Sequence, residues 1–78
     1  MSATYKVQYN PQISMATRQY IADNFIACMS GSDSDLYDLD CIIEDIMDDD
    51  EHIANISPED WSTLRDLNET HQIGYLEF

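Results

Sequence analysis

The segment from residue 35 to residue 51 limits the possible folds more than any other part of this chain. Its apolar residues recur at intervals of three and four, at Leu36, Leu39, Ile43 and Ile46, with Ile42 and Met47 beside them. A helix turns by about 100° per residue, so this spacing places the apolar side chains on one face. The remaining circumference is acidic, with Tyr37 and Cys41 interleaved. We therefore predict an amphipathic helix over residues 35–51.

A first helix is predicted over residues 15–30. Ser14 is placed to cap its N-terminus and Gly31 to end it. Apolar residues follow at helical spacing, at Ile21, Phe25, Cys28 and Met29. This pattern predicts a helix packed in the centre of the fold, followed by a connecting turn over residues 30–34.

The last helix has the clearest start signal in the chain. Ser57 is placed as the N-cap, Pro58 as the first helical residue, and Asp60 three positions after the cap, as in an approximate capping box. Trp61 and Leu64 continue its apolar face, and we expect the helix to end at about Glu69.

The two ends of the chain are predicted to be short strands. Residues 4–9 alternate between apolar and polar side chains, and residues 72–78 are apolar and aromatic. The expected fold is a single domain over residues 1–78, mainly helical but of the α+β class. It has about three helices and short N- and C-terminal strands that are able to pair. The predicted core is Ile21, Phe25, Leu39, Ile43, Ile46, Trp61 and Leu64.

The charge of the chain is extreme for its size. Sixteen Asp and Glu face three Lys and Arg, a formal net charge of −13. Solubility of a small domain needs a net charge of only about 2 to 8. No Lys or Arg stands between Arg18 and Arg65, and the acids of residues 48–51 would lie at a helix C-terminus, where the macrodipole disfavours them. Folding does not explain these acids, and we expect a basic partner rather than nucleic acid or an anionic membrane.

Specific chemistry is not indicated elsewhere. Asp33, Asp35 and Glu44 match three positions of a calcium loop but not the turn-forming glycine, and a frame starting at Asp48 fails similarly. The two cysteines and two histidines lack the paired spacing of a zinc site, and no nucleophile signature surrounds Cys28. We expect no enzyme activity, no catalytic residue, no metal ligand and no cofactor.

The expected location is the cytoplasm. The chain shows neither the pattern of a signal peptide nor an apolar run of the roughly 18 residues that span a membrane. Two cysteines without close spacing favour reduced thiols over a disulfide scaffold.

The acidic helix face has a charge density suited to imitating nucleic acid. As a helix, residues 35–51 would span about 25 Å, and their nine carboxylates would give about one charge per 2.8 Å. Duplex DNA carries about one per 1.7 Å of axis. The residues expected to face the partner are Asp38, Asp40, Glu44, Asp45, Asp48, Asp49, Asp50 and Glu51.

This profile of small size, high negative charge, no signal peptide and an acidic helix face resembles the small acidic inhibitors of phages and mobile elements, of the anti-CRISPR or anti-restriction class. The resemblance implies a non-enzymatic protein that inhibits a basic nucleic-acid-binding protein or ribonucleoprotein in the bacterial cytoplasm. Among such targets, a CRISPR effector is the one we prefer. The alternative is an acidic regulatory adaptor or antitoxin-like module whose apolar surface dominates binding. Oligomeric state and target identity are left open by the sequence.

Overall fold

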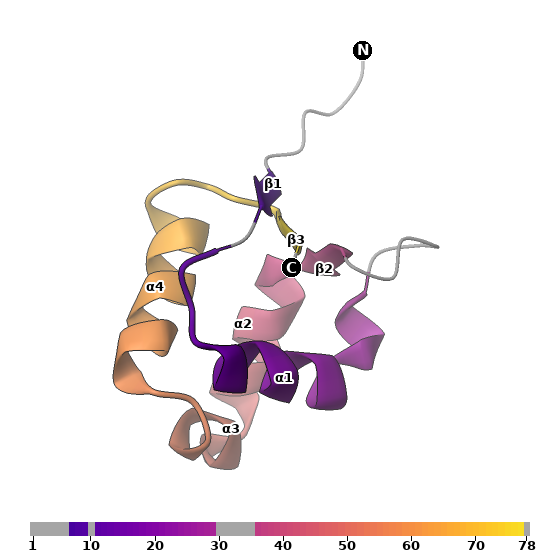
Figure 1. Ribbon diagram of the computed structural model, residues 1–78, viewed down its shortest axis with the longest axis vertical. Helices are drawn as coiled ribbons and strands as arrows, with labels where there is room; N and C mark the ends of the chain where they lie inside the picture. The colour runs from indigo at the N-terminus through magenta and orange to yellow at the C-terminus, as the bar shows by residue number, and fades with distance from the viewer. Residues whose placement is uncertain (1–6, 10, 30–35, 78) are drawn as a thin grey trace.

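The computed structural model describes residues 7–9, 11–29 and 36–77 (Figure 1). The elements are β1 (Val7–Tyr9), α1 (Met15–Asn24), the 3-10 helix η1 (Ile26–Cys28), β2 (Leu36–Asp38), α2 (Leu39–Asp48), α3 (Asp50–Ala54), α4 (Pro58–Glu69) and β3 (Tyr75–Glu77). The fold is mainly helical and of the α+β class, as predicted. The expected strand residues 4–6, the turn at residues 30–34, the helix stop at Gly31 and the acids Asp33 and Asp35 lie outside the described residues.

The strands form one three-stranded sheet in the order β1-β3-β2. β1 pairs in parallel with β3, with Val7 opposite Tyr75, so the predicted N- and C-terminal strands do pair. β2 pairs antiparallel with the other edge of β3, with Leu36 opposite Glu77. The C-terminal strand is thus the central one, and the sheet lies at the end of the molecule opposite α3 (Figure 1).

The start of the predicted helix over residues 35–51 was wrong, because residues 36–38 form β2. Their side chains alternate, so Tyr37 points inward and is only 6% exposed, rather than lying on the acidic side. Asp38 then caps α2, its side chain accepting a hydrogen bond from the amide of Cys41. Pairing with β3 therefore overrides the local helical pattern at these three residues.

The end of that predicted helix was also wrong, because the helix breaks at Asp49. Asp49 has extended backbone angles (φ −141°, ψ 113°), and its side chain accepts a hydrogen bond from the amide of Glu51. Aspartate favours such local bonds over a continuous helix. A second short helix, α3, therefore begins at Asp50.

The first and last helices differ in how closely they follow the prediction. α4 begins after the Ser57 cap at Pro58 and ends at Glu69, as predicted. α1 is capped by Ser14 but ends at Asn24, and the chain continues as η1. The break at Phe25 (φ −120°, ψ 40°) leaves the Phe25 ring buried in the core.

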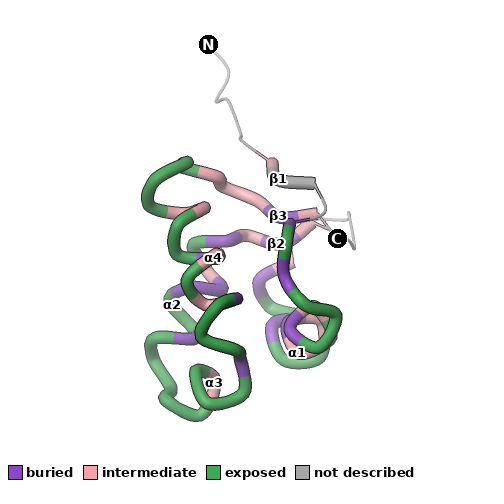
Figure 2. Tube along the Cα trace, turned by 60° about the vertical axis from the view of Figure 1, so that its left-hand side comes forward, coloured by how far each residue is buried: buried purple, intermediate pink, exposed green. Residues whose placement is uncertain are grey.

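The core lies between α1, α2, α4 and the sheet (Figure 2). Six of the seven predicted core residues are buried, whereas Trp61 is half-buried at the edge, where Arg65 lies over its ring. Buried apolar residues that the prediction omitted are Ile13, Cys28, Tyr37, Ile42, Ile56 and Leu76. They come from the connecting segments, from η1, from the sheet and from the flank of the α2 apolar face.

Asp60 joins the N-termini of α1 and α4. Its carboxylate accepts hydrogen bonds from the Ser14 hydroxyl (2.7 Å), the Ser14 amide (3.2 Å) and the Thr17 hydroxyl (2.5 Å). Burial by itself raises the pKa of Asp60, but the hydrogen bonds from Thr17, Ser14 and Ser57 outweigh it, so this pKa lies below its ordinary value. Asp60 is thus an ionised, buried link between two helices.

Candidate functional site

The acidic face of α2 is present as predicted over residues 39–48. Leu39, Ile42, Ile43 and Ile46 are buried on one side of the helix. Asp40, Glu44 and Asp48 are exposed and recur at four-residue intervals, so they follow one line along the helix. Asp45 is also exposed and lies beside this line. We call these four residues the α2 acidic face.

The predicted acids that follow Asp48 do not continue the α2 helix but belong to α3. Asp49 is the N-cap of α3, and Asp50 and Glu51 are exposed in its first turn. Three of the four acids at residues 48–51 therefore lie at a helix N-terminus, where the macrodipole favours negative charge. The expectation that all four disfavour folding was wrong, and it holds only for Asp48, in the last turn of α2.

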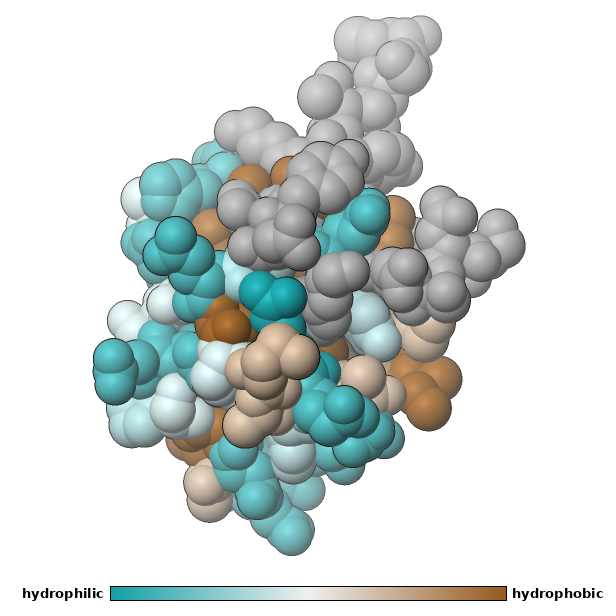
Figure 3. Space-filling model, viewed as in Figure 1, coloured by the Kyte–Doolittle hydropathy of each residue, from teal (hydrophilic) through white to brown (hydrophobic). Residues whose placement is uncertain are grey.

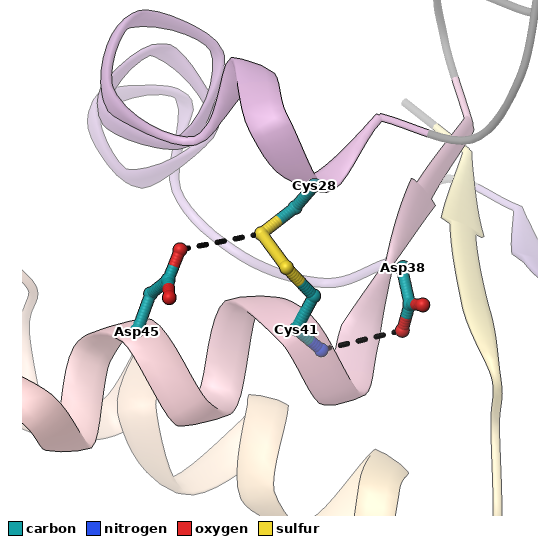
Figure 4. Close-up of a disulfide and its surroundings, with 4 residues drawn as sticks. All are labelled: Cys28, Asp38, Cys41 and Asp45. Atoms are coloured by element: carbon teal, nitrogen blue, oxygen red, sulfur yellow. Dashed lines mark hydrogen bonds between the residues drawn. A yellow bond between two sulfur atoms is a disulfide. The ribbon is translucent and has the colours of Figure 1, made fainter.

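Three of the predicted partner-binding residues have contacts within the fold: Asp49, which caps α3, and Asp38 and Asp45. Asp38 is half-buried and accepts a hydrogen bond from the Cys41 amide at 3.2 Å. Asp45 Oδ2 lies 3.4 Å from Cys28 Sγ (Figure 4). The surface available to a partner is therefore best defined by Asp40, Glu44 and Asp48, with Asp50 and Glu51 on α3.

Arg65, His71 and Arg18 each have a polar partner within the fold. Arg65 Nε lies 3.0 Å from Glu69 on the same helix, and His71 Nε2 lies 3.2 Å from Asp66. Arg18 donates to the carbonyl oxygen of Pro11 at 2.6 Å. The two acids in the first two contacts, Glu69 and Asp66, both belong to α4 rather than to the α2 acidic face.

Apolar side chains interrupt the acidic region. Met47 is 59% exposed on α2, three residues after Glu44, and Ile53 is 38% exposed on α3. In Figure 3 the described surface is mostly hydrophilic, with separate apolar areas. A partner that contacts the acids of α2 and α3 would also meet these two side chains.

A Tyr–His pair holds α3 against α1. Tyr20 Oη lies 2.6 Å from His52 Nδ1, and the His52 ring packs edge-on against Phe25, with centroids 4.9 Å apart. Burial, followed by the charges of Glu51 and Asp49, raises the pKa of Tyr20. The Tyr20 phenol therefore keeps its proton at neutral pH. Because α3 has no buried residue of its own, the Tyr20–His52 pair attaches it to the core.

The cysteines form a disulfide between η1 and α2, contrary to the expectation of reduced thiols. Cys28 and Cys41 have Cα atoms 5.6 Å apart, a normal separation for such a bond (Figure 4). The sequence placed Cys41 among the acids, and nothing in a separation of 13 residues indicates that the two sulfurs meet. The four-residue spacing of Cys41 and Asp45 was the one available signal that these two share a helix face.

A hollow of about 340 Å³ runs along α4 and is lined by Trp61, Ser62, Arg65, Asp66, Glu69 and Thr70. It contains none of the predicted site residues.

Among the described residues, no helix is both long and apolar enough to cross a bilayer. Comparison of the chain with protein-family models, with curated proteins and with solved structures found no match.

Proposed function

We propose that this protein is a non-enzymatic inhibitor that occupies the nucleic-acid site of a basic nucleic-acid-binding protein or ribonucleoprotein in the bacterial cytoplasm. A CRISPR effector is the preferred target. The observation that supports the proposal is the line of Asp40, Glu44 and Asp48, exposed directly opposite the buried face of α2.

The break at Asp49 changes the charge density on which the proposal rests. The ten residues of α2 span about 15 Å, so Asp40, Glu44 and Asp48 give about one charge per 5 Å, and Asp45 beside them brings this to about one per 4 Å. One strand of DNA carries a phosphate about every 3.4 Å. The α2 acidic face therefore approaches the charge spacing of one strand, and α3 adds further acids at its end.

The proposal predicts competition with nucleic acid. A target captured from a bacterial lysate on the immobilised protein would be purified and titrated with the labelled protein, with and without its DNA or guide RNA. We expect nucleic acid to displace the protein. A target that holds both at once would contradict mimicry.

A matched pair of double variants tests which surface binds. Glu44→Gln/Asp48→Asn removes two charges from the α2 acidic face with little change of shape. We expect its affinity for the target to fall by roughly tenfold for each lost contact with Lys or Arg. The control, Asp23→Asn/Glu59→Gln, removes two exposed charges from α1 and α4 and should bind as the parent does. Equal effects of the two variants would mean that only total charge matters.

The exposure of Met47 and Ile53 supports the second candidate, a regulatory adaptor or antitoxin-like module that binds through apolar contacts. Its complex should persist at high salt and weaken in a Met47→Ser variant. The complex of a mimic should instead dissociate as its charges are screened.

A further inference from the structure

The contact between Asp45 and Cys28 fits a reduced cysteine pair better than the disulfide. Cys28 Sγ lies 3.4 Å from Asp45 Oδ2 and is bonded to Cys41 Sγ (Figure 4). A disulfide sulfur carries no hydrogen, so it donates nothing to the carboxylate. A thiol in the same place donates a hydrogen bond, and a thiolate in the same place shares a cation with the carboxylate.

Three metal-ligating atoms converge at this point from two elements. Cys28 is the last residue of η1, and Cys41 and Asp45 lie one turn apart on α2. The two sulfurs and one carboxylate oxygen all lie within 4.8 Å of one another. Cys28 is 2% exposed, whereas Asp45 is exposed and leaves the group open to solvent on one side.

The separation between the Cys28 sulfur and the Asp45 oxygen fits tetrahedral zinc. With Zn–S bonds of about 2.3 Å and a Zn–O bond of about 2.1 Å, tetrahedral angles place sulfur and oxygen about 3.6 Å apart and the two sulfurs about 3.8 Å apart. The Cys28–Asp45 separation is already 3.4 Å. Opening the sulfur–sulfur bond and turning the two side chains apart supplies the remaining distance.

We propose that the reduced protein binds Zn²⁺ through Cys28, Cys41 and Asp45, with water in the fourth position, and that the disulfide and the zinc site are alternative states of the same residues. Two thiolates favour zinc over magnesium or calcium, and the carboxylate favours zinc over the softer Cu(I). The negative charge of the chain also attracts the cation.

The interconversion needs a thiol reductant such as glutathione. Two reductant thiols give two electrons and two protons to the Cys28–Cys41 bond, which yields two protein thiols and one reductant disulfide. Zn²⁺ then replaces the two thiol protons, which are released to solvent. Either state connects η1 to α2, so the link between them persists in both reducing and oxidising conditions.

Cobalt substitution tests the site directly. The full chain is reduced, freed of reductant under anaerobic conditions and titrated with Co²⁺. We expect a thiolate-to-cobalt charge-transfer band and the visible bands of tetrahedral Co²⁺, saturating at one equivalent and displaced by one equivalent of Zn²⁺. The oxidised protein should show neither band.

A pair of single variants assigns the carboxylate. Asp45→Asn should weaken Zn²⁺ binding, measured against a chromophoric indicator, by roughly tenfold or more. Asp48→Asn removes the same charge from the same helix and should leave the affinity within about twofold, because its carboxylate is absent from the cluster. Both variants keep the cysteines, and circular dichroism checks that both remain folded. The absence of the cobalt–thiolate band in the reduced parent, or equal zinc affinities of the two variants, would overturn the proposal.

Discussion

At the scale of single residues, Asp60 links sequence to tertiary structure most directly. It lies in the first turn of α4, where its backbone amide donates to Ser57 Oγ. Its carboxylate meanwhile accepts a hydrogen bond from the hydroxyl of Ser14, the N-cap of a different helix, which lies 46 residues away in the sequence. A local capping signal thus coincides with a long-range contact. Because Asp60 is only 6% exposed and the buried Thr17 hydroxyl donates to its carboxylate, removal of the carboxylate leaves that hydroxyl without its acceptor.

Replacing Asp60 should therefore change both stability and its dependence on pH. We expect Asp60→Ala to lower the free energy of unfolding by about 3 kcal/mol at pH 7. The pKa of Asp60 is lower in the folded state than in the unfolded state, where it is about 4. The charge of Asp60 therefore stabilises the fold fully above the unfolded pKa, and this stabilisation is lost as the pH falls from there through the folded pKa.

Urea denaturation of the parent and of Asp60→Asn between pH 7 and pH 2.5 measures this dependence. The difference between their free energies of unfolding should be constant down to about pH 5 and shrink below about pH 4. Subtracting the free energy of unfolding of Asp60→Asn from that of the parent at each pH removes the contribution of the other carboxylates. Their mutual repulsion also decreases at low pH. A difference that grows as the pH falls would contradict the assignment.

At the scale of elements, the position of the helix break determines what each acid does. Asp48 ends α2, where the macrodipole opposes it, and Asp49 caps α3, where its carboxylate is bound by the Glu51 amide at 3.0 Å. Two adjacent aspartates therefore have opposite effects on folding.

Single substitutions at these two positions should shift stability in opposite directions. Asp49→Ala should lower the free energy of unfolding by about 1 kcal/mol, because the cap of α3 is lost, whereas Asp49→Asn keeps a capping side chain and should cost less. Asp48→Asn should raise stability by a few tenths of a kcal/mol. Urea denaturation at low salt measures all three. Stabilisation by Asp49→Ala would instead indicate one continuous helix through this position.

At the scale of the whole molecule, the net charge of −13 destabilises the folded state but favours binding of a basic partner. Like charges repel one another in the compact state and attract a basic partner. The protein is therefore expected to be less stable at low salt, under the conditions in which it binds most tightly.

Raising NaCl from about 0.1 M to about 1 M shortens the Debye length from about 10 Å to about 3 Å. We expect the free energy of unfolding in urea to rise by on the order of 1 kcal/mol, while the affinity for the target falls by more than tenfold. The Glu44→Gln/Asp48→Asn variant should show a smaller salt effect on both quantities. A free energy of unfolding that falls with salt would show that ion pairs, rather than repulsion, dominate the folded surface.

Features that depend on a few neighbouring residues were determined by the sequence itself. The bounds of α4 follow from Ser57 and Pro58, and the opposed faces of α2 follow from the spacing of its isoleucines and acids. Both are set by hydrogen bonds and side-chain directions within one or two turns. The mainly helical α+β class follows from the same local patterns, whereas the sequence left open whether the two terminal strands pair, because that contact joins the two ends of the chain.

The tertiary structure decided the features that join distant segments. Residues 36–38 have a helical pattern, yet they form β2 because β3, almost forty residues later, provides the strand partner. Cys28 meets Cys41 and Asp45 only because η1 turns back onto α2, and Asp60 reaches Ser14 only because α1 and α4 begin side by side. A sequence pattern reports the preference of a segment, whereas these contacts depend on where another segment is placed.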